Sequence, residues 1–363
     1  YLTREFYLYN PQTNSYYLSK TKPNYYLKPE ITNSYEAGLN MKYFHGTLSL
    51  DATYYHSNTK NQTHLAKLEN AEYENVLIQA GSVVNSGIEL ALGYENKWGN
   101  FGWSSNYTFS YNKNEIKRLV RNAEVEGQNI EMTQIDKATL GSSGSPIVRL
   151  TEGGTMGDIY MTSDFKRDNN GYIYLDHATL LPSMVNLSPD EYKKVGSLLP
   201  KYHMGWRNSF TFKGFKLNVL INGRFGGVVV SNTQAMLDRY GVSKYSADLR
   251  KAGGVNINGR NISAQDYLNV VGEGTGKADH YVYKADNIRL QELSLEYTIS
   301  RKYLKNIADL TLGFVGSNLA LLYCKAPFDP EVVASASSTY YTGVDYFMQP
   351  SLRNLGFSVK VQF

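Results

Sequence analysis

Two glycine-rich segments contain residue types that nucleotide-binding and nucleophilic sites use. The segment "GEGTGK" (272–277) ends in the Gly-Lys pair of a phosphate-binding loop. That loop would also need Gly in place of Val271 and Ser or Thr in place of Ala278. The segment "GSSGS" (141–145) lacks the final glycine of a nucleophile elbow. We therefore interpret the first segment as a flexible loop and assign no nucleophile to the second.

The spacing of possible metal ligands also differs from known metal sites. In "RDNNG" (167–171), placing Gly171 at the invariant glycine of a calcium loop puts Lys166 where the first carboxylate ligand belongs. We interpret Asn170–Gly171 as a hairpin turn. The six histidines show neither an HExxH motif nor paired metal-ligand spacing: His45, His56, His64, His177, His203 and His280. The sequence therefore predicts no catalytic residue, no metal and no cofactor, and it disfavours an enzyme.

Aromatic and polar side chains in the long segments between predicted strands could instead bind a ligand. Aromatic rings with hydroxyls offer flat apolar faces, and carboxylates and amides offer polar edges, a mixture that suits sugars, peptides and protein surfaces. The candidate ligand- or partner-contacting residues are Tyr160, Asp164, Asp168, Tyr172, Tyr174, Asn232, Tyr240, Tyr323, Phe328, Asp329, Tyr340, Tyr341 and Tyr346. Packing within the loops would use the same residue types, so the pattern leaves both interpretations open.

The elements that must position these residues alternate between apolar and polar side chains. At the end of the chain Leu355, Phe357, Val359, Val361 and Phe363 form one series, and polar or small residues fill the positions between them. A period of two indicates a strand with one apolar and one polar face. The same alternation recurs in segments at 34–43, 47–54, 87–95, 101–111, 215–222, 288–299 and 308–314.

These segments are long for strands of a soluble protein. They run for about ten residues or more, whereas globular strands average roughly five or six and a tilted strand that crosses a bilayer needs about nine to eleven. The alternation of Leu293, Leu295 and Ile299 is out of step with that of Ile288 and Leu290. The sequence therefore predicts a bulge at Gln291–Glu292.

Short and long connections alternate along the chain. The short ones are His45–Gly46, Lys97–Asn100, Lys213–Gly214 and Arg301–Ile307, and the long ones are Asn10–Thr32, Asn58–Asn85, Arg118–His203, Gly226–Asp286 and Ala320–Leu352. Outer-membrane barrels have this order, with tight periplasmic turns and long extracellular loops. It places Phe363 at the periplasmic rim and predicts that the last strand closes the barrel against its first strand.

Composition agrees with a membrane barrel and excludes other classes. The 363 residues include 31 Tyr, charged residues make up 19%, and the net charge of +4 is scattered, so nucleic-acid binding is not expected. The single cysteine, Cys324, excludes an intrachain disulfide framework. Aromatic residues gather at the predicted periplasmic ends, where they suit the membrane interface: Tyr43, Tyr94, Trp98, Phe101, Trp103, Phe210, Phe212, Phe215, Tyr297 and Phe363.

The sequence predicts about ten strands if Tyr1–Tyr9 is counted as the first. The chain begins at Tyr1 without a methionine or a signal peptide. An exported barrel needs a signal peptide, which is removed on maturation. We expect the chain to be the C-terminal part, residues 1–363, of the barrel of a larger polypeptide.

Several blocks, in this order, resemble one family, the SusC/RagA-type TonB-dependent outer-membrane transporters. These blocks are "LKPEITNSYEAGLNMKYF" (27–44), "GTMGDIYMTSDFKRDNNGYIYLD" (154–176), "GSLLPKYHMGWRNSFTFKGFKLNVLINGRFGG" (196–227), "DNIRLQELSLEYTIS" (286–300), "FVGSNLALL" (314–322) and "FDPE" (328–331). They span nearly the whole chain. The terminal strand, with Phe357, Val359, Val361 and Phe363, is similar to the family's barrel-assembly signal.

The resemblance implies a 22-stranded barrel with a plug domain in its lumen, of which this chain would supply about ten strands. It implies active import of a nutrient, an oligosaccharide (glycan) or an oligopeptide, in the outer membrane of a Gram-negative bacterium of the Bacteroidetes type. The implied partners are outer-membrane lipid, a SusD-like surface lipoprotein that captures the ligand, and the TonB–ExbB–ExbD complex, which acts on the plug.

Two other functions stay open at the level of sequence. A passive porin or surface adhesin would have the same strands but no plug before Tyr1. A soluble sugar-binding β-sandwich would share the alternation but would not partition into detergent micelles.

Overall fold

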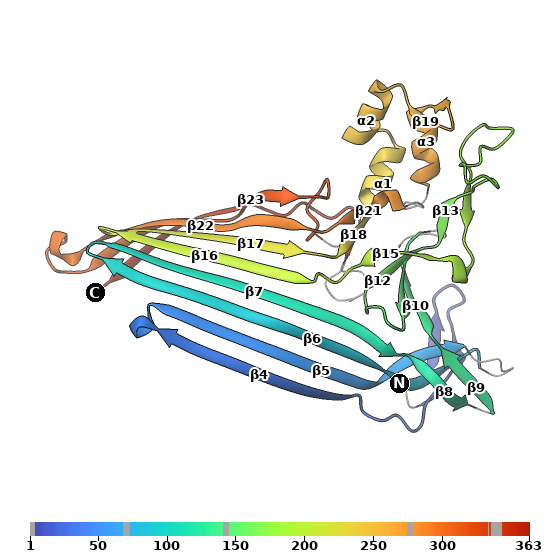
Figure 1. Cartoon of the computed structure of the whole chain (residues 1–363), viewed down its shortest axis with the longest axis horizontal. Coiled ribbons are helices and arrows are strands. Elements are labelled where there is room, and N and C mark those ends of the chain that lie inside the picture. The colour runs from blue at the N-terminus through green and yellow to red at the C-terminus, as the bar shows by residue number, and fades with distance from the viewer. Residues whose placement is uncertain are drawn as a thin grey trace.

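The computed structural model describes residues 4–67, 73–125, 127–140, 145–273, 279–332, 334 and 343–363. Long strands dominate it and form one curved, ten-stranded sheet (Figure 1). Nine long strands build this sheet in the described residues: β4 (Ile31–Tyr43), β5 (Leu48–Lys67), β6 (Asn75–Trp98), β7 (Phe101–Arg118), β16 (Tyr202–Phe212), β17 (Phe215–Phe225), β22 (Asn287–Ile299), β23 (Asp309–Cys324) and β25 (Asn354–Gln362). The tenth, β3 (Thr21–Lys22), pairs with β6 in parallel.

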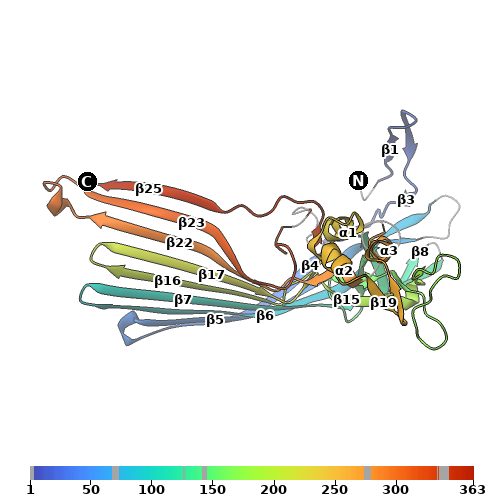
Figure 2. The same ribbon diagram turned by 90° about the horizontal axis from the view of Figure 1, so that it is seen from above.

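The long strands are antiparallel to their neighbours and follow the order β25-β23-β22-β17-β16-β7-β6-β5-β4. Consecutive long strands of the chain are neighbours in the sheet, joined by short turns at one end and by longer segments at the other, as in an up-and-down barrel. The sheet is open in this structure, with β4 and β25 at its two edges, as Figure 2 shows. The predicted class, an antiparallel wall of a membrane barrel, is confirmed, whereas closure of the last strand against a first strand is not observed.

All four predicted short turns lie at one end of the sheet, together with the C-terminus (Figures 1 and 2). We call it the turn end, and the opposite end the loop end. At the turn end residues 44–47 join β4 to β5, and residues 213–214 join β16 to β17. Gly214 has a φ of +89°, a conformation that glycine adopts without strain.

The predicted loop Asn58–Asn85 is wrong, because β5 continues to Lys67 and β6 begins at Asn75. The polar run in this stretch hid the pairing, which extends through His64↔Ile78. At the far end of this ribbon Ala66, Val76 and Ile78 are buried together with Val120 of β8. Strand pairing therefore continues past the alternating segments because local packing supports it.

The predicted first strand, Tyr1–Tyr9, is also wrong. Residues 1–3 lie outside the described residues, and β1 (Tyr7–Asn10) pairs with β2 (Ser15–Leu18) in a separate hairpin. Asn14, with a φ of +50°, lies in its turn, and the Tyr9 and Tyr16 rings lie 5.2 Å apart. The tight turn gives this segment a partner of its own, so it does not join the long sheet.

The two faces of the sheet differ in chemistry as the alternation predicted. On the outer face large apolar side chains are exposed, among them Leu39, Ile88, Leu312 and Phe357. Two tryptophans pair with polar residues of this face: the indole N–H of Trp206 donates to Ser105 Oγ at 3.0 Å, and that of Trp103 donates to Asn208 Oδ1 at 3.1 Å. Paired polar groups suit a surface that faces hydrocarbon, where an unpaired one is costly.

The predicted bulge and aromatic cluster are both present. Leu220 pairs with Glu292 and Ile221 with Leu290, which leaves Gln291 without a partner across the ladder. Near the turn end the rings of Phe215 and Tyr297 lie 4.4 Å apart.

The loop end is built from three segments with their own secondary structure. Residues 119–201 form β8 (Val120–Val125), β9 (Gln128–Met132), β10 (Gln134–Thr139), β11 (Ile147–Thr151), β12 (Asp158–Met161), β13 (Ser163–Phe165), β14 (Met184–Asn186) and β15 (Lys193–Ser197). Residues 226–286 form β18 (Val228–Ser231), α1 (Asn232–Arg239), α2 (Lys244–Lys251), β19 (Val255–Ile257), β20 (Arg260–Ile262), α3 (Ala264–Val271) and β21 (Val282–Lys284). Residues 325–353 contain β24 (Val344–Asp345).

Serine side chains cap the three α-helices of the described residues. Ser231, Ser243 and Ser263 each accept a hydrogen bond from a backbone N–H of the first helical turn, which satisfies a donor that the helix itself leaves unpaired. Among the helices of the described ranges, none is long and apolar enough to cross a membrane.

Candidate functional site

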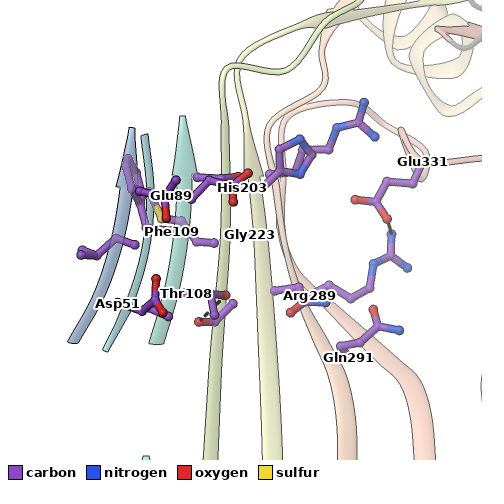
Figure 3. Close-up of a pocket in the computed structure, with 17 residues that line it drawn as sticks. Asp51, Glu89, Thr108, Phe109, His203, Gly223, Arg289, Gln291 and Glu331 are labelled. Atoms are coloured by element: carbon purple, nitrogen blue, oxygen red, sulfur yellow. Dashed lines mark hydrogen bonds and ion pairs between the residues drawn. The ribbon is translucent and has the colours of Figure 1, made fainter. Parts of the chain in front are cut away.

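The inner, polar face of the sheet contains a cavity of about 450 Å³ towards the loop end (Figure 3). Two adjacent rows of cross-strand partners form its wall. The first row runs Thr53, Glu89, Ser110, His203 and Arg224, and the second runs Asp51, Ala91, Thr108, Gly205, Asn222 and Arg289. Because each residue lies opposite the next across a strand pair, the rows place side chains from six strands on one surface.

Charge is divided across this cavity. Asp51 and Glu89 come from β5 and β6, whereas His203, Arg224 and Arg289 come from β16, β17 and β22. Figure 3 shows the two carboxylates on one side and Arg289, with Glu331 of the last loop, on the other. The wall can therefore contact a ligand that carries groups of opposite polarity at its two ends.

Arg289 is buried and connects the last loop to the wall. Its guanidinium donates to Asp329 Oδ1 at 2.6 Å and to Asn318 Oδ1, and lies 3.7 Å from Glu331 Oε2. Ser351 donates to the other Asp329 oxygen at 2.5 Å. Burial alone would raise the pKa of the Asp329 carboxyl, but the hydrogen bonds from Arg289 and Ser351 outweigh it and lower the pKa. Asp329 is thus ionised at neutral pH and neutralises Arg289.

The helical part of the loop end contains a second buried polar cluster, around Asp238. The carboxylate accepts from Gln234 Nε2 at 2.7 Å and from Ser243 Oγ. Burial raises the pKa of Tyr267 to about 12 and raises that of Tyr281 as well. Burial also lowers the pKa of His280, against the opposing effect of Asp238 and Asp279. At neutral pH these tyrosines are therefore protonated.

The predicted contact residues of the first long loop are arranged along its strands and turns. The Tyr160 hydroxyl donates to Thr151 Oγ1 at 3.2 Å, and Asp164 forms an ion pair with Lys193. Asp168 accepts from the N–H groups of Asn170 and Tyr172, both at 2.9 Å, which builds the predicted Asn170–Gly171 turn. The Lys166 ammonium lies 4.4 Å from the centroid of the Tyr174 ring, and Tyr172 is exposed.

The predicted residues of the other two loops differ in exposure. Asn232 is buried at the start of α1, where it donates to the Leu140 carbonyl at 3.0 Å, and Phe328 packs against Tyr283 with ring centroids 5.6 Å apart. Tyr240, Tyr323 and Tyr346 expose 69%, 40% and 54% of their surface. Tyr340 and Tyr341 lie outside the described residues.

Sequence reasoning missed the charged inner wall. Asp51, Glu89, Arg224 and Arg289 stand at the polar positions of their strands, so the alternation indicated their face. What the sequence did not supply was the register, which brings them into adjacent rows. In the ranges that the structure describes, no group of three or more His, Cys, Asp or Glu side chains could hold a metal ion.

An amphipathic antiparallel sheet with tight turns at one end, structured loops at the other and a polar inner cavity defines the wall of an outer-membrane-type barrel. The family model described as "TonB dependent receptor-like, beta-barrel" matches residues 6–187, half of the chain, and the chain belongs to this family. Members of the family are outer-membrane proteins of Gram-negative bacteria and are receptors rather than enzymes.

Relatives from Formosa agariphila agree with this assignment. The chain is 24% identical to TonB-dependent receptor P3 over 356 residues, covering 93% of this chain and 34% of that protein. It is 22% identical to TonB-dependent receptor P26 over 333 residues, covering 83% of this chain and 31% of that protein. The chain therefore spans about a third of the length of these relatives.

Solved structures share the fold. The structure of the RagAB peptide transporter superposes with a TM-score of 0.73 at 17% identity, covering 100% of this chain and 38% of that chain. The RagAB peptide importer in its "open-open" state gives 0.70 at 16% identity and also covers 100% of this chain and 38% of that chain. The resemblance to SusC/RagA-type TonB-dependent transporters is thereby confirmed.

Proposed function

We propose that residues 1–363 form the C-terminal part of the barrel of a TonB-dependent importer in the outer membrane of a Bacteroidetes-type bacterium. The observation that carries the proposal is the polar cavity on the inner face of a wall whose outer face is apolar. In this proposal the ligand enters the cavity from the loop end. The rest of the protein would supply further strands, to a total of 22, and a plug on which the TonB–ExbB–ExbD complex acts.

The cargo in this proposal is a nutrient, either an oligosaccharide or an oligopeptide, delivered by a SusD-like surface lipoprotein. One structural neighbour is the RagAB peptide transporter, which supports the peptide alternative. The Formosa relatives support the bacterial group. The family assignment supports transport without enzymatic activity.

The loop end is the proposed surface for the ligand and the lipoprotein. The exposed rings of Tyr172, Tyr240, Tyr323 and Tyr346 are the strongest candidates because they offer flat apolar area to water. Tyr160, Asp164, Asp168, Tyr174, Asn232, Phe328 and Asp329 would act by holding the loops that carry those rings, and Tyr340 and Tyr341 stay contact candidates. At the other end Phe357, Val359, Val361 and Phe363 are the proposed barrel-assembly signal.

Replacing the loop between Cys324 and Asn354 by a short Gly-Ser linker tests this assignment in the full-length protein. It retains β23 and β25, so the barrel should still insert and keep its heat-modifiable mobility on a gel. Growth on the imported nutrient should be abolished, and co-purification of the lipoprotein should weaken. A matched control replaces the exposed Lys302, Tyr303 and Lys305 at the turn end by Ala.

Normal growth and co-purification in the linker variant would move the recognition surface to the plug or to the other loops. Growth that survives loss of TonB would instead favour a passive porin.

A further inference from the structure

One row of the inner wall carries an acidic group near one end and a basic group at the other. Glu89 pairs with Ser110, Ser110 with His203, and His203 with Arg224. These residues lie on four strands that are neighbours in the sheet, β6, β7, β16 and β17. Neighbouring strands are about 4.8 Å apart, so Glu89 and Arg224 are separated by roughly 14 Å along this row. Four residues of extended peptide span about the same distance.

Arg224 differs from the other inner-face arginines of the described wall. Arg289 is neutralised by Asp329, and Arg207 lies 3.5 Å from Glu292. Arg224 forms no hydrogen bond or ion pair within the described residues, and its Nε is buried without a partner. Its cross-strand neighbours are His203 and Asn287 rather than carboxylates. Glu331, the nearby acid of the last loop, lies 3.7 Å from Arg289 and accepts from Asn287 Nδ2 at 3.3 Å.

The wall beside Arg224 is shaped to admit a group. The second row of the wall, next to the row of Arg224, contains Gly205, where an added Cβ would lie 2.7 Å from Thr108 Oγ1. The Thr108 hydroxyl therefore occupies the space that a side chain at residue 205 would need, and the room for a ligand is the cavity lined by His203, Asn222 and Arg224.

The opposite side of the cavity retains negative charge. Glu89 forms no ion pair or hydrogen bond with the residues that the structure describes, and Asp51 accepts from Asn40 Nδ2 at 2.8 Å. A ligand that crosses the cavity would therefore meet hydrogen-bond acceptors near Glu89 and unpaired donors at Arg224.

We propose that Arg224 binds a carboxylate group of the imported molecule, with the donor groups of that molecule directed towards Glu89 and Asp51. The planar guanidinium matches a carboxylate with two parallel N–H···O bonds. A peptide C-terminus and a uronic acid of an oligosaccharide share this chemistry. The inference rests on the proposed transport function, because it names the group by which that cargo is held.

The test uses the complete transporter purified in detergent and four probe mixtures. These are a casein hydrolysate, a pectin-oligosaccharide hydrolysate, and the carboxyl-amidated form of each, with retained molecules identified by mass spectrometry. We expect the wild type to retain acids from one hydrolysate and at least tenfold less of the amidated form. Which hydrolysate supplies the acids distinguishes peptide from uronate.

Three variants isolate the role of Arg224. Arg224→Gln should lower retention of the acids at least tenfold. Retention by Arg224→Lys should lie between that of Arg224→Gln and that of the wild type, because the charge remains but the planar guanidinium is lost. Lys216→Gln is the matched control, since it removes a cation from the same face of β17 nearer the turn end, and should retain the acids normally. Insertion of all variants is checked by heat-modifiable mobility.

The inference is overturned if the wild type retains nothing, if amidation has no effect, or if Arg224→Gln behaves like Lys216→Gln. It is also overturned if Arg224→Gln lowers thermal stability without ligand and leaves retention unchanged, because Arg224 would then pair with another part of the protein, such as the plug. Dependence of growth on TonB reports on transport itself, so failure of this inference and failure of the proposed function are distinguishable.

Discussion

At the scale of residues, the Arg289–Asp329 pair links the last loop to the wall. Arg289 lies on β22, two residues before the bulge at Gln291. Its side chain is only 6% exposed. A buried guanidinium needs a partner, because removing charge from water is costly without one. Asp329 supplies it from a segment 40 residues further along the chain. The proline that follows, Pro330, restricts the backbone of Asp329 and fixes this approach.

Asp329→Asn should therefore destabilise the attachment of the loop by about 3–5 kcal/mol, because it leaves Arg289 buried with a weaker partner. The measurement is the rate of limited proteolysis within residues 325–353 of the inserted protein at pH 7. Lys325→Gln is the control: its ion pair with Asp286 is partly exposed, and such pairs contribute at most about 1 kcal/mol.

The same pair predicts a dependence on pH. The folded pKa of Asp329 is lowered, so its contribution is complete above the unfolded pKa of about 3.9 and is lost as pH falls through the folded value. The difference in proteolysis between wild type and Asp329→Asn should accordingly shrink below about pH 4. An equal difference at pH 3 and pH 7 would contradict the ionic role of Asp329.

At the scale of elements, strand register decides which face each residue occupies. Leu312 pairs with Val359 on the outer face, while Thr311 Oγ1 lies 2.9 Å from Thr298 Oγ1 on the inner face. An arginine facing mid-membrane costs roughly 2–4 kcal/mol, whereas inner-face positions tolerate charge. Leu312→Arg should thus lower the outer-membrane level and heat-modifiable fraction far more than Thr311→Arg. Equal effects would mean that the register is shifted by one residue.

The sequence predicted the features that follow from side-chain alternation along a single strand. Alternation predicted the outer and inner faces, and the break in phase before Leu293 predicted the bulge at Gln291, because side-chain period is a direct consequence of strand geometry. It failed for the extension of β5 to Lys67, since the polar run at 58–64 has no alternation of apolar and polar residues to detect. The charged rows needed the register of six strands, which depends on pairing between distant segments.

At the scale of the whole molecule, the three loop-end segments share one apolar core. Leu140, Val148, Ile159 and Leu198 come from residues 119–201, Val230 comes from β18, and Val344 comes from β24. The backbone adds to this packing, because β24 pairs in parallel with β18 and Ser231 donates to Asp345 Oδ2 at 2.5 Å. Segments more than a hundred residues apart in sequence are thus packed as one unit at the loop end.

Leu198→Ala tests whether this core makes the loop end cooperative. Leu198 is 4% exposed, and an added Cβ at Gly343 would lie 2.0 Å from its Cδ2, so the packing around it is close. Truncating it should cost about 2–5 kcal/mol. Because one core serves three segments, amide hydrogen exchange should accelerate in β12, β18 and β24 together and stay unchanged in β16 and β17. The exposed Leu180 supplies the control, Leu180→Ala, which should leave exchange as in the wild type. Faster exchange restricted to the neighbours of residue 198 would show that the three loop-end segments move independently and that the shared core does not couple them.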